Sequence, residues 1–556
     1  MLAPGEELVF APLGGVGEIG MNLSMYGLGT AARRSWLAVD LGVSFAAEEH
    51  LPGVDLILPD IRFLVAERKN LAGIVLTHAH EDHFGALLDL WPQLQVPVYA
   101  TPFTAALFAA KRLSEPGAPD IPVNVVGLDS RFSVGPFDIE LVTVTHSIPE
   151  SNALIIRTPH GALLHTGDWK LDPTPVIGSP TDEAKLRRLG DEGCIALMGD
   201  STNAVREGRS PSEADVAKTL AELIKNAPGR VAVTTFASSV SRLRSVAEAA
   251  RAAEREVIVV GRAMERVVQV ARETGYMDGV QDFRGIDVFG YLPPDKVVAL
   301  CTGSQGEPRA ALARIAESTH PDIALSPGDR VIFSSRTIPG NEKEVGTIIN
   351  GLINLGVEVI TDRTHLVHVS GHPRKAELED MLRWVRPRIV VPVHGEALHL
   401  SEHADLARRV GVPKVIRCRN GDLIRLAPDP GKIDELPSGR VFKDGNILVS
   451  ADSRTVGERR RLSFAGYVSV ALALTEKGAL ASDPDVELVG IPETGKGGEP
   501  MSDIAYDAVV ETFESLPKAK RRDPDTLAEA VRRSVRAAIR AHWGKKPVCF
   551  VHVLEV

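Results

Sequence analysis

A histidine-rich stretch near the start of the chain carries the residue types best suited to chemistry. Three imidazoles and two carboxylates fall within six positions: His78, His80, Glu81, Asp82 and His83. Neutral imidazole and carboxylate oxygen are ligands that Zn²⁺ and Mn²⁺ accept. A solvated loop that is rich in histidine by chance is the alternative, but the chain has only 16 histidines in 556 residues. The stretch therefore predicts a divalent-metal site.

Three more potential ligands lie far along the chain from this stretch. His146, Asp168 and His394 each come directly after a predicted strand, where a rigid sheet can hold a side chain in place. Each alone is more typical of a hydrogen-bonded structural residue. Together with the histidine-rich stretch they form one ordered set of metal ligands. We interpret His165, close to Asp168, as structural.

A glycine pattern near the N-terminus suggests a different chemistry. Gly15, Gly17 and Gly20 match the dinucleotide-binding spacing, and Asp40 follows at the distance of a ribose-binding acid. That motif requires a helix after the third glycine, whereas residues 21–28 alternate with the period of a strand. We therefore expect turns between strands and disfavour a nicotinamide site.

The elements that must position these residues change in character along the chain. Residues 1–207 read mostly as short strands, and residues 208–365 alternate between strands and helices, as in a parallel α/β sheet. Residues 366–426 are expected to complete the domain that residues 1–207 begin, and they contain the predicted strand that precedes His394. Residues 427–440 are rich in Pro, Gly and Asp and predict a linker. Residues 441–556 predict a small C-terminal α/β domain.

Composition excludes several classes of protein. Apolar residues make up 44% and charged residues 24%, which is typical of a globular chain of several domains. The net charge of −10 excludes a uniformly basic nucleic-acid coat, although a local basic groove is compatible with it. The four cysteines are scattered, so a reducing compartment is expected. Neither a signal peptide nor a membrane span is apparent, and we expect a cytoplasmic protein.

The ordered ligands resemble those of the metallo-β-lactamase fold, in which HxHxDH is followed by a His, an Asp and a His. The resemblance implies two divalent ions, with Zn²⁺ expected and Mn²⁺ or Mg²⁺ as alternatives. The implied ligands are His78, His80 and His146 for the first ion, Asp82, His83 and His394 for the second, and Asp168 as the bridge. It also implies that Asp40 orients a ligating histidine through the free ring N–H.

The long gap between Asp168 and His394 narrows the resemblance to the β-CASP branch, which acts on nucleic acids. Asp200 and His372 match further motifs of that branch. The ordered stretches HAHEDHFGAL, HSIPES, HTGDWKLDPTP, MGDSTNA, TTFASS, GRAMER, CTGSQGEP, IPGNE, HVSGH and PVHGE resemble the bacterial ribonuclease J family. The implied fold is a metallo-β-lactamase αββα sandwich with an inserted β-CASP α/β domain and a small C-terminal α/β domain.

The same resemblance implies a function. We expect a metal-dependent ribonuclease that hydrolyses RNA phosphodiester bonds. It would act as a 5′→3′ exonuclease that favours 5′-monophosphate ends, with possible endonuclease activity, in mRNA turnover and rRNA processing. The implied catalytic residues are His372, Asp82 and Asp200. The expected RNA- and phosphate-binding residues, which could equally be ordinary turn residues, are Ser238, Ser239, His368, Ser370, Gly371 and His372.

Two positions depart from the family pattern. Ser241 lies where the family usually has a histidine, within the run Ser239–Arg242, and Pro373 lies where a small residue is usual. Both positions belong to expected substrate-contact loops. They bear on RNA contacts and on endonuclease preference, and they leave the metal ligands intact.

We also expect the chain to assemble with copies of itself, and two alternative functions are open. The resemblance implies a C-terminal domain that supports a homodimer or a higher homo-oligomer. The first alternative function is another hydrolase of the same fold, such as a thioester or lactone hydrolase. The second is a non-catalytic RNA-binding subunit. The long insertion disfavours the first, and the complete ligand set disfavours the second.

Overall fold

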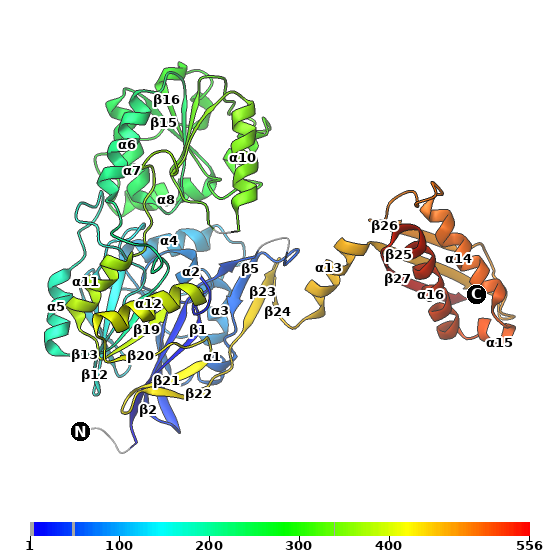
Figure 1. Ribbon diagram of the computed structural model, residues 1–556, viewed down its shortest axis with the longest axis horizontal. Coiled ribbons are helices and arrows are strands. Elements are labelled where there is room, and N and C mark those ends of the chain that lie inside the picture. Colours follow the sequence, from blue (N-terminus) through cyan, green and yellow to red (C-terminus); the bar gives the residue numbers. More distant parts are fainter. Residues whose placement is uncertain (1–4, 47–49, 339) are drawn as a thin grey trace. The chain divides into compact units, whose positions relative to one another are not determined.

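The structure is a computed structural model that describes residues 5–46, 50–338 and 340–556 (Figure 1). The chain divides into two compact units, which we describe separately. The larger unit spans residues 1–45 and 56–441, and the smaller one comprises residues 442–556 with the segment 46–55. No helix in the described ranges is both long and apolar enough to cross a membrane.

Two large sheets form the centre of the larger unit. The eight-stranded sheet has the order β22 (Gly431–Glu435), β21 (Asp422–Ala427), β1 (Glu7–Gly14), β2 (Leu23–Thr30), β3 (Arg33–Val39), β6 (Leu71–Val75), β7 (Val98–Ala100), β8 (Val123–Val125). The seven-stranded sheet has the order β20 (Lys414–Val415), β19 (Ile389–Val393), β13 (Cys194–Asp200), β12 (Gly161–His165), β11 (Asn152–Thr158), β10 (Phe137–Thr143), β9 (Arg131–Val134). A short antiparallel pair is formed by β4 (Ser44–Phe45) and β5 (Leu56–Pro59).

Helices cover the outer face of each large sheet. The helices whose buried side chains pack in the core of the eight-stranded sheet are α1 (Arg62–Ala66), α2 (Glu81–Phe84), α3 (Leu87–Leu94) and α4 (Pro102–Leu113). Those that pack on the seven-stranded sheet are α5 (Glu183–Glu192), α11 (Lys375–Val385) and α12 (Ala397–Val410). Alternate strand residues pack between the sheets, as Phe10 and Leu141 do, or beneath helices, as Ile155 does. The predicted αββα sandwich is therefore confirmed.

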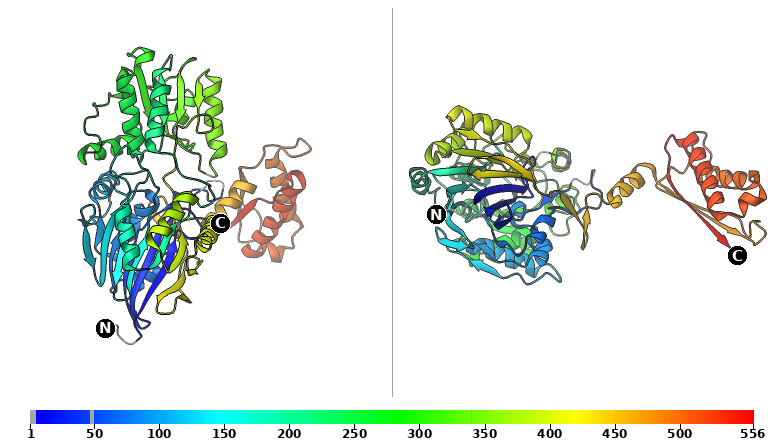
Figure 2. Two further views of the ribbon diagram at one scale, coloured as in Figure 1. Left: turned by 60° about the vertical axis from the view of Figure 1, so that its left-hand side comes forward. Right: turned by 90° about the horizontal axis from the view of Figure 1, so that it is seen from below.

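A parallel α/β domain is inserted between two neighbouring strands of this sandwich. Its sheet has the order β15 (Glu256–Val260), β16 (Val297–Cys301), β14 (Val231–Thr234), β17 (Arg330–Phe333), β18 (Glu358–Ile360). Its helices are α6 (Glu213–Lys225), α7 (Val240–Ala252), α8 (Arg262–Glu273), α9 (Ala311–Ala316) and α10 (Glu342–Asn354), with short 3₁₀ turns at Ile286–Val288 and Pro294–Lys296. The insertion leaves after β13 and returns before β19, and these two strands pair in parallel. The left view of Figure 2 shows the inserted sheet (green) beyond one end of the sandwich.

The smaller unit has its own core. It contains β24 (Ile447–Ser450), α13 (Arg454–Ala465), a sheet in the order β26 (Asp485–Val489), β25 (Tyr467–Leu474), β27 (Val548–Glu555), and the helices α14 (Met501–Ser515), α15 (Lys518–Arg521) and α16 (Pro524–Trp543). Strand β23 (Arg440–Asp444) lies at the boundary of the two units. Val470 of β25 packs with Val509 of α14 and Val531 of α16. The predicted C-terminal α/β fold is confirmed.

Two local interpretations of the sequence are resolved by the structure. Within the predicted linker at 427–440, β22 pairs with β21 at the edge of the eight-stranded sheet. Backbone pairing at a sheet edge does not depend on apolar side chains, so its Pro-, Gly- and Asp-rich composition gave no sign of it. Gly15, Gly17 and Gly20 lie in the loop between β1 and β2 with φ of 82°, 83° and 97°. They are turn glycines, as expected.

Candidate metal centre

The predicted ligands converge at one edge of the two sheets. His78 follows β6, His146 follows β10, Asp168 follows β12 and His394 follows β19. Strands β12, β13 and β19 run parallel, so their carboxyl ends meet at the same edge. The remaining ligands lie in the first turn of α2 or just before it, directly after the loop from β6. Residues separated by more than 300 positions thus share one site.

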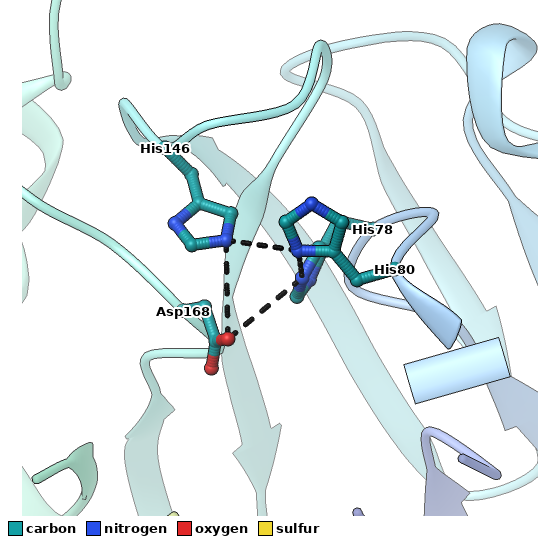
Figure 3. Close-up of side chains that lie close together, drawn as sticks. All are labelled: His78, His80, His146 and Asp168. Carbon is teal, nitrogen blue, oxygen red and sulfur yellow. Dashed lines mark hydrogen bonds and ion pairs between the residues drawn. The ribbon is translucent and has the colours of Figure 1, made fainter. Parts of the chain in front are cut away.

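The first cluster contains three histidines and one aspartate (Figure 3). Nδ1 of His80 lies 3.2 Å from Nε2 of His78 and 3.1 Å from Nε2 of His146. Oδ2 of Asp168 lies 3.9 Å from Nε2 of both His78 and His146. All four donor atoms therefore point into one small volume.

The second cluster contains Asp82, His83 and His394 together with the same aspartate oxygen. Oδ2 of Asp168 lies 3.2 Å from Nε2 of His83 and 3.3 Å from Nε2 of His394. Oδ2 of Asp82 lies 3.6 and 3.8 Å from those two nitrogens. Asp168 is the residue that both clusters share.

This donor set fits divalent metal ions. Within each cluster the donor atoms lie within 4.8 Å of one another, which matches ligands about 2 Å from a common centre. Among the described residues, Oδ1 of Asp168 and Nε2 of His394 are buried without a hydrogen-bond partner. Buried polar atoms normally have partners. A bound cation would provide them here.

A second layer of contacts fixes the ring orientations. Oδ2 of Asp40 lies 2.7 Å from Nδ1 of His83, Oδ1 of Asn22 lies 2.9 Å from Nδ1 of His394, and the carbonyl of Gly371 lies 2.7 Å from Nδ1 of His146. These acceptors place the ring proton on Nδ1, which leaves Nε2 free to bind a metal. Asp40 thus contacts the predicted ligand His83.

The histidine ligands fall into two groups by the direction of their pKa shifts. Burial lowers the pKa of His78 and His80 well below the usual value, and lowers that of His146 to about 4. Burial also lowers the pKa of His83 and His394, but carboxylates, foremost Asp168, outweigh it and raise both values. Burial would raise the pKa of Asp168, yet the histidines around it hold that pKa well below the usual value. The first cluster therefore presents neutral imidazoles.

His372 lies beside the ligands, and its side chain is more exposed than those of His78, His83, His146 and His394. Its Nδ1 is 2.8 Å from Oδ2 of Asp200 and 3.8 Å from Oδ2 of Asp168. The His372 side chain is 20% exposed, against 0% for Asp200 and 2% for Asp168. Burial lowers its pKa, but Asp200 and then Asp168 outweigh this and raise the pKa to about 9. Its imidazole is oriented by a buried carboxylate and is open to the site.

Four family models match successive parts of the chain. They are "Metallo-beta-lactamase superfamily" (36–262), "Ribonuclease J, beta-CASP domain" (228–352), "Zn-dependent metallo-hydrolase RNA specificity domain" (356–417) and "Ribonuclease J C-terminal domain" (454–556). A Ribonuclease J of Sinorhizobium meliloti is 56% identical over 556 residues, with 100% of this chain and 98% of the relative covered. One from Mycolicibacterium smegmatis is 40% identical with the same coverage.

The chain belongs to the ribonuclease J family. It is therefore a metal-dependent ribonuclease that acts on RNA. A solved structure from Enterococcus faecalis, described as a protein of unknown function, covers 76% of this chain and all of its own, with a TM-score of 0.51 and 16% identity. That likeness concerns the fold alone.

The predicted phosphate-binding residues lie in two loops, one before α7 with Ser238 and Ser239 and one before α11 with His368–His372. Oγ of Ser370 accepts a hydrogen bond from Nδ2 of Asn203 at 2.9 Å. Ser239 is buried just before α7, and Ser238 is half-buried next to it. Gly371 has a role that the sequence did not indicate, because its carbonyl accepts from His146. His368 is half-buried, and burial lowers its pKa.

Ser241, which departs from the ribonuclease J pattern, borders a cavity of about 130 Å³ next to His146. Its hydroxyl is buried and has no hydrogen-bond partner among the described residues. Glu213 and Tyr276 also line this cavity. Ser241 thus borders a cavity that the predicted metal ligand His146 also lines. Pro373, the other departure, is buried and directly follows His372 in the sequence.

Several residues near the centre escaped the sequence analysis. Asn22 and Thr77 lie outside the motifs that carry the family resemblance, yet Asn22 contacts His394, and the Thr77 hydroxyl lies 2.9 Å from Nδ1 of His78. The glycine turn gives a partial signal for Asn22, since a Cβ at Gly15 would lie 2.3 Å from Oδ1 of Asn22. Such contacts depend on the folded arrangement.

Proposed function

We propose that the chain hydrolyses RNA with two divalent ions, Zn²⁺ by preference and Mn²⁺ or Mg²⁺ as substitutes. The single observation that carries the proposal is Asp168, whose Oδ2 faces both clusters of donor atoms. The proposed ligands are those of the sequence analysis: His78, His80 and His146 for the first ion, Asp82, His83 and His394 for the second, and Asp168 for both. Divalent ions held there supply Lewis acidity, which lowers the pKa of water and neutralises charge on phosphate oxygens.

The chain's own residues have three tasks in this proposal. The ligands would hold the two metal ions in a fixed geometry, and Asp40 keeps the His83 ring oriented through the 2.7 Å contact. Asp82 is 26% exposed at its side chain, so it borders the space left for the substrate. Asp200 orients His372.

His372 is proposed as the group that assists the leaving oxygen. When the phosphorus–oxygen bond breaks, the departing 3′ oxygen needs a proton. An imidazole held by a carboxylate on one nitrogen can donate from the other. His372 has this arrangement and is more exposed than the histidine ligands His78, His83, His146 and His394. The alternative is that His372 contacts a non-bridging phosphate oxygen.

Three arginines support an RNA-binding surface at the same end of the unit. Arg206, Arg336 and Arg374 are half-buried, and no carboxylate among the described residues forms an ion pair with them. Burial and the charges of Arg336 and Arg374 lower the pKa of Arg206. The backbone N–H of Lys375, next to Arg374, donates to the carbonyl of Arg206 at 3.0 Å. Clustered, unneutralised guanidinium groups in a chain of net charge −10 favour a phosphate-rich ligand.

The proposal extends to reaction direction and cellular role. We expect 5′→3′ exonuclease action that favours 5′-monophosphate ends, held by the loops of Ser238, Ser239 and His368–His372, with endonuclease activity in addition. The role is RNA maturation and decay, including mRNA turnover and rRNA processing, in the cytoplasm. The match to the RNA specificity domain at 356–417 covers one of these loops.

A homodimer through the C-terminal unit is also part of the proposal. One face of the sheet β26–β25–β27 packs on α14 and α16, while Val489, Phe550 and Leu554 lie on the other face with exposed fractions of 54%, 52% and 58%. Exposed apolar side chains on one sheet face favour burial against another chain.

A comparison of RNA ends tests the proposed function. Full-length protein would be incubated with one RNA sequence that carries a 5′ monophosphate, triphosphate or hydroxyl, with and without added Zn²⁺, Mn²⁺ or Mg²⁺. We expect mononucleotides to be released from the 5′ end, fastest from the monophosphate. A chromogenic ester serves as the control for another hydrolase of this fold. Ester hydrolysis without RNA cleavage would contradict the proposal.

A further inference from the structure

One buried carboxylate outside the ligand set joins three loops of the metal centre. Glu377, in the first turn of α11, is 0% exposed. Its Oε1 accepts from the backbone N–H of Leu171 at 2.8 Å. Its Oε2 accepts from the N–H of Ser210 at 2.9 Å, the hydroxyl of Ser210 at 2.8 Å and the N–H of Arg374 at 2.9 Å.

Local helix capping explains one of these four bonds. The contact from Arg374 to Glu377 has the spacing of a capping box at the start of α11. The bonds from Leu171 and Ser210 reach across 206 and 167 residues of sequence. A capping residue needs one oxygen, and here the other oxygen is directed to a different loop.

The donors belong to the loops that carry the active groups. Leu171 is three residues after Asp168, Arg374 is two residues after His372, and Ser210 lies in the segment that leaves Asp200. The hydroxyl of Ser210 also lies 3.5 Å from the carbonyl of His372. Glu377 therefore fixes the spacing between the shared aspartate and the exposed histidine.

Two acceptor oxygens are needed for this pattern. No basic side chain among the described residues lies within ion-pair distance of Glu377, so its hydrogen bonds come from neutral donors alone. Both of its oxygens accept, whereas a glutamine offers one acceptor and one NH₂ group. The NH₂ group would face an N–H donor of either Leu171 or Ser210.

We propose that Glu377 is a positioning residue of the metal centre, which sets the place of Asp168 and His372 relative to the other ligands. The inference rests on the proposed metal-dependent function. Residues that orient metal ligands typically change metal affinity or activity by about 10–100-fold when replaced. Glu377 acts through the backbone, so its loss should loosen two loops without removing a ligand.

The test compares Glu377→Gln with a matched control, Asp329→Asn, in the full chain. Asp329 is 3% exposed and accepts backbone N–H bonds from Arg230 and Ser326 at 2.8 and 2.9 Å, within the inserted domain. For each protein, binding of Zn²⁺ alone is measured by calorimetry, and RNA hydrolysis is measured against Zn²⁺ concentration. We expect Glu377→Gln to weaken Zn²⁺ binding and lower kcat by about 10–100-fold with KM little changed. Asp329→Asn should lose thermal stability alone.

Glu377→Gln with wild-type Zn²⁺ binding and kcat would overturn the proposal, whatever its melting temperature. If Glu377→Gln does not fold, Ser210→Ala removes a single bond to Oε2, and it should shift the Zn²⁺ dependence in the same direction. An unchanged dependence in Ser210→Ala would then count against the proposal. The Zn²⁺ binding measurement uses no RNA. A wild type that binds Zn²⁺ but does not cleave RNA would therefore refute the proposed function, while the Zn²⁺ affinity of Glu377→Gln would still decide the positioning role of Glu377.

Discussion

His372 differs from the neighbouring histidines in exposure and in its partner. Because it contacts Asp200 and faces the accessible side, we expect His372→Gln to retain both metal ions. The single-turnover rate of RNA hydrolysis should fall by about 10²–10⁴-fold, the usual effect of losing one positioned proton donor. Rapid-quench kinetics with elemental analysis of the same sample would measure both. A loss of one metal ion would instead place His372 among the ligands.

The two groups of histidines predict how metal binding depends on pH. The raised pKa values of His83 and His394 mean that these imidazoles hold a proton more tightly than a free imidazole does, and a metal must displace that proton. His146, with its pKa lowered to about 4, is already neutral. We therefore expect affinity at the second cluster to rise from pH 6 to 8 while the first changes little.

Calorimetric Zn²⁺ titrations at pH 7 in buffers of different ionisation enthalpy measure the protons released. Proton release should accompany filling of the second cluster and should be smaller in His83→Gln, which leaves His394 as the other histidine of that cluster with a raised pKa. Equal heats in all buffers for the wild type would contradict this assignment.

At the scale of elements, the loop between β18 and α11 is held close to a ligand. A Cβ added at Gly371 would lie 2.5 Å from two atoms of the His146 ring. We expect Gly371→Ala to displace His146 and to weaken metal binding by about 10–100-fold. Gly346→Ala on α10 is the matched control, because nothing lies within 4 Å of its added Cβ. Elemental analysis after dialysis measures the change, and equal metal retention in both variants would contradict it.

The ligands could be predicted from sequence because their residue types are rare and they follow apolar strands. The inserted domain could be predicted because strands and helices alternate regularly between Asp200 and His394. The contacts of Asn22 and Gly371 could not, since they join positions 372 and 225 residues apart and depend on the packed sheets. Strand β22 was missed because an edge strand needs only backbone pairing, which composition does not reveal.

At the scale of the whole molecule, the C-terminal unit contains none of the proposed ligands. We expect the full chain to form a homodimer. A chain that ends at Asp452, between β24 and α13, should assemble from fewer subunits. The cut leaves β22 in its sheet. The shortened protein should still bind metal but hydrolyse RNA more slowly, through weaker RNA binding or lower stability. Light scattering of both proteins gives the subunit count, and an unchanged count would exclude the assembly role.

The central claim is that one aspartate joins two metal-binding clusters. Elemental analysis of the purified full chain and of Asp168→Ala, with RNA hydrolysis assayed on the same samples, tests it most directly. The control is His165→Gln, a buried histidine whose Nδ1 lies 2.9 Å from the Tyr26 hydroxyl instead of facing the clusters. We expect about two divalent ions per chain in the wild type and the control. Asp168→Ala should stay folded by circular dichroism but lose bound metal and activity. Wild-type cleavage by Asp168→Ala with both ions retained would contradict the account.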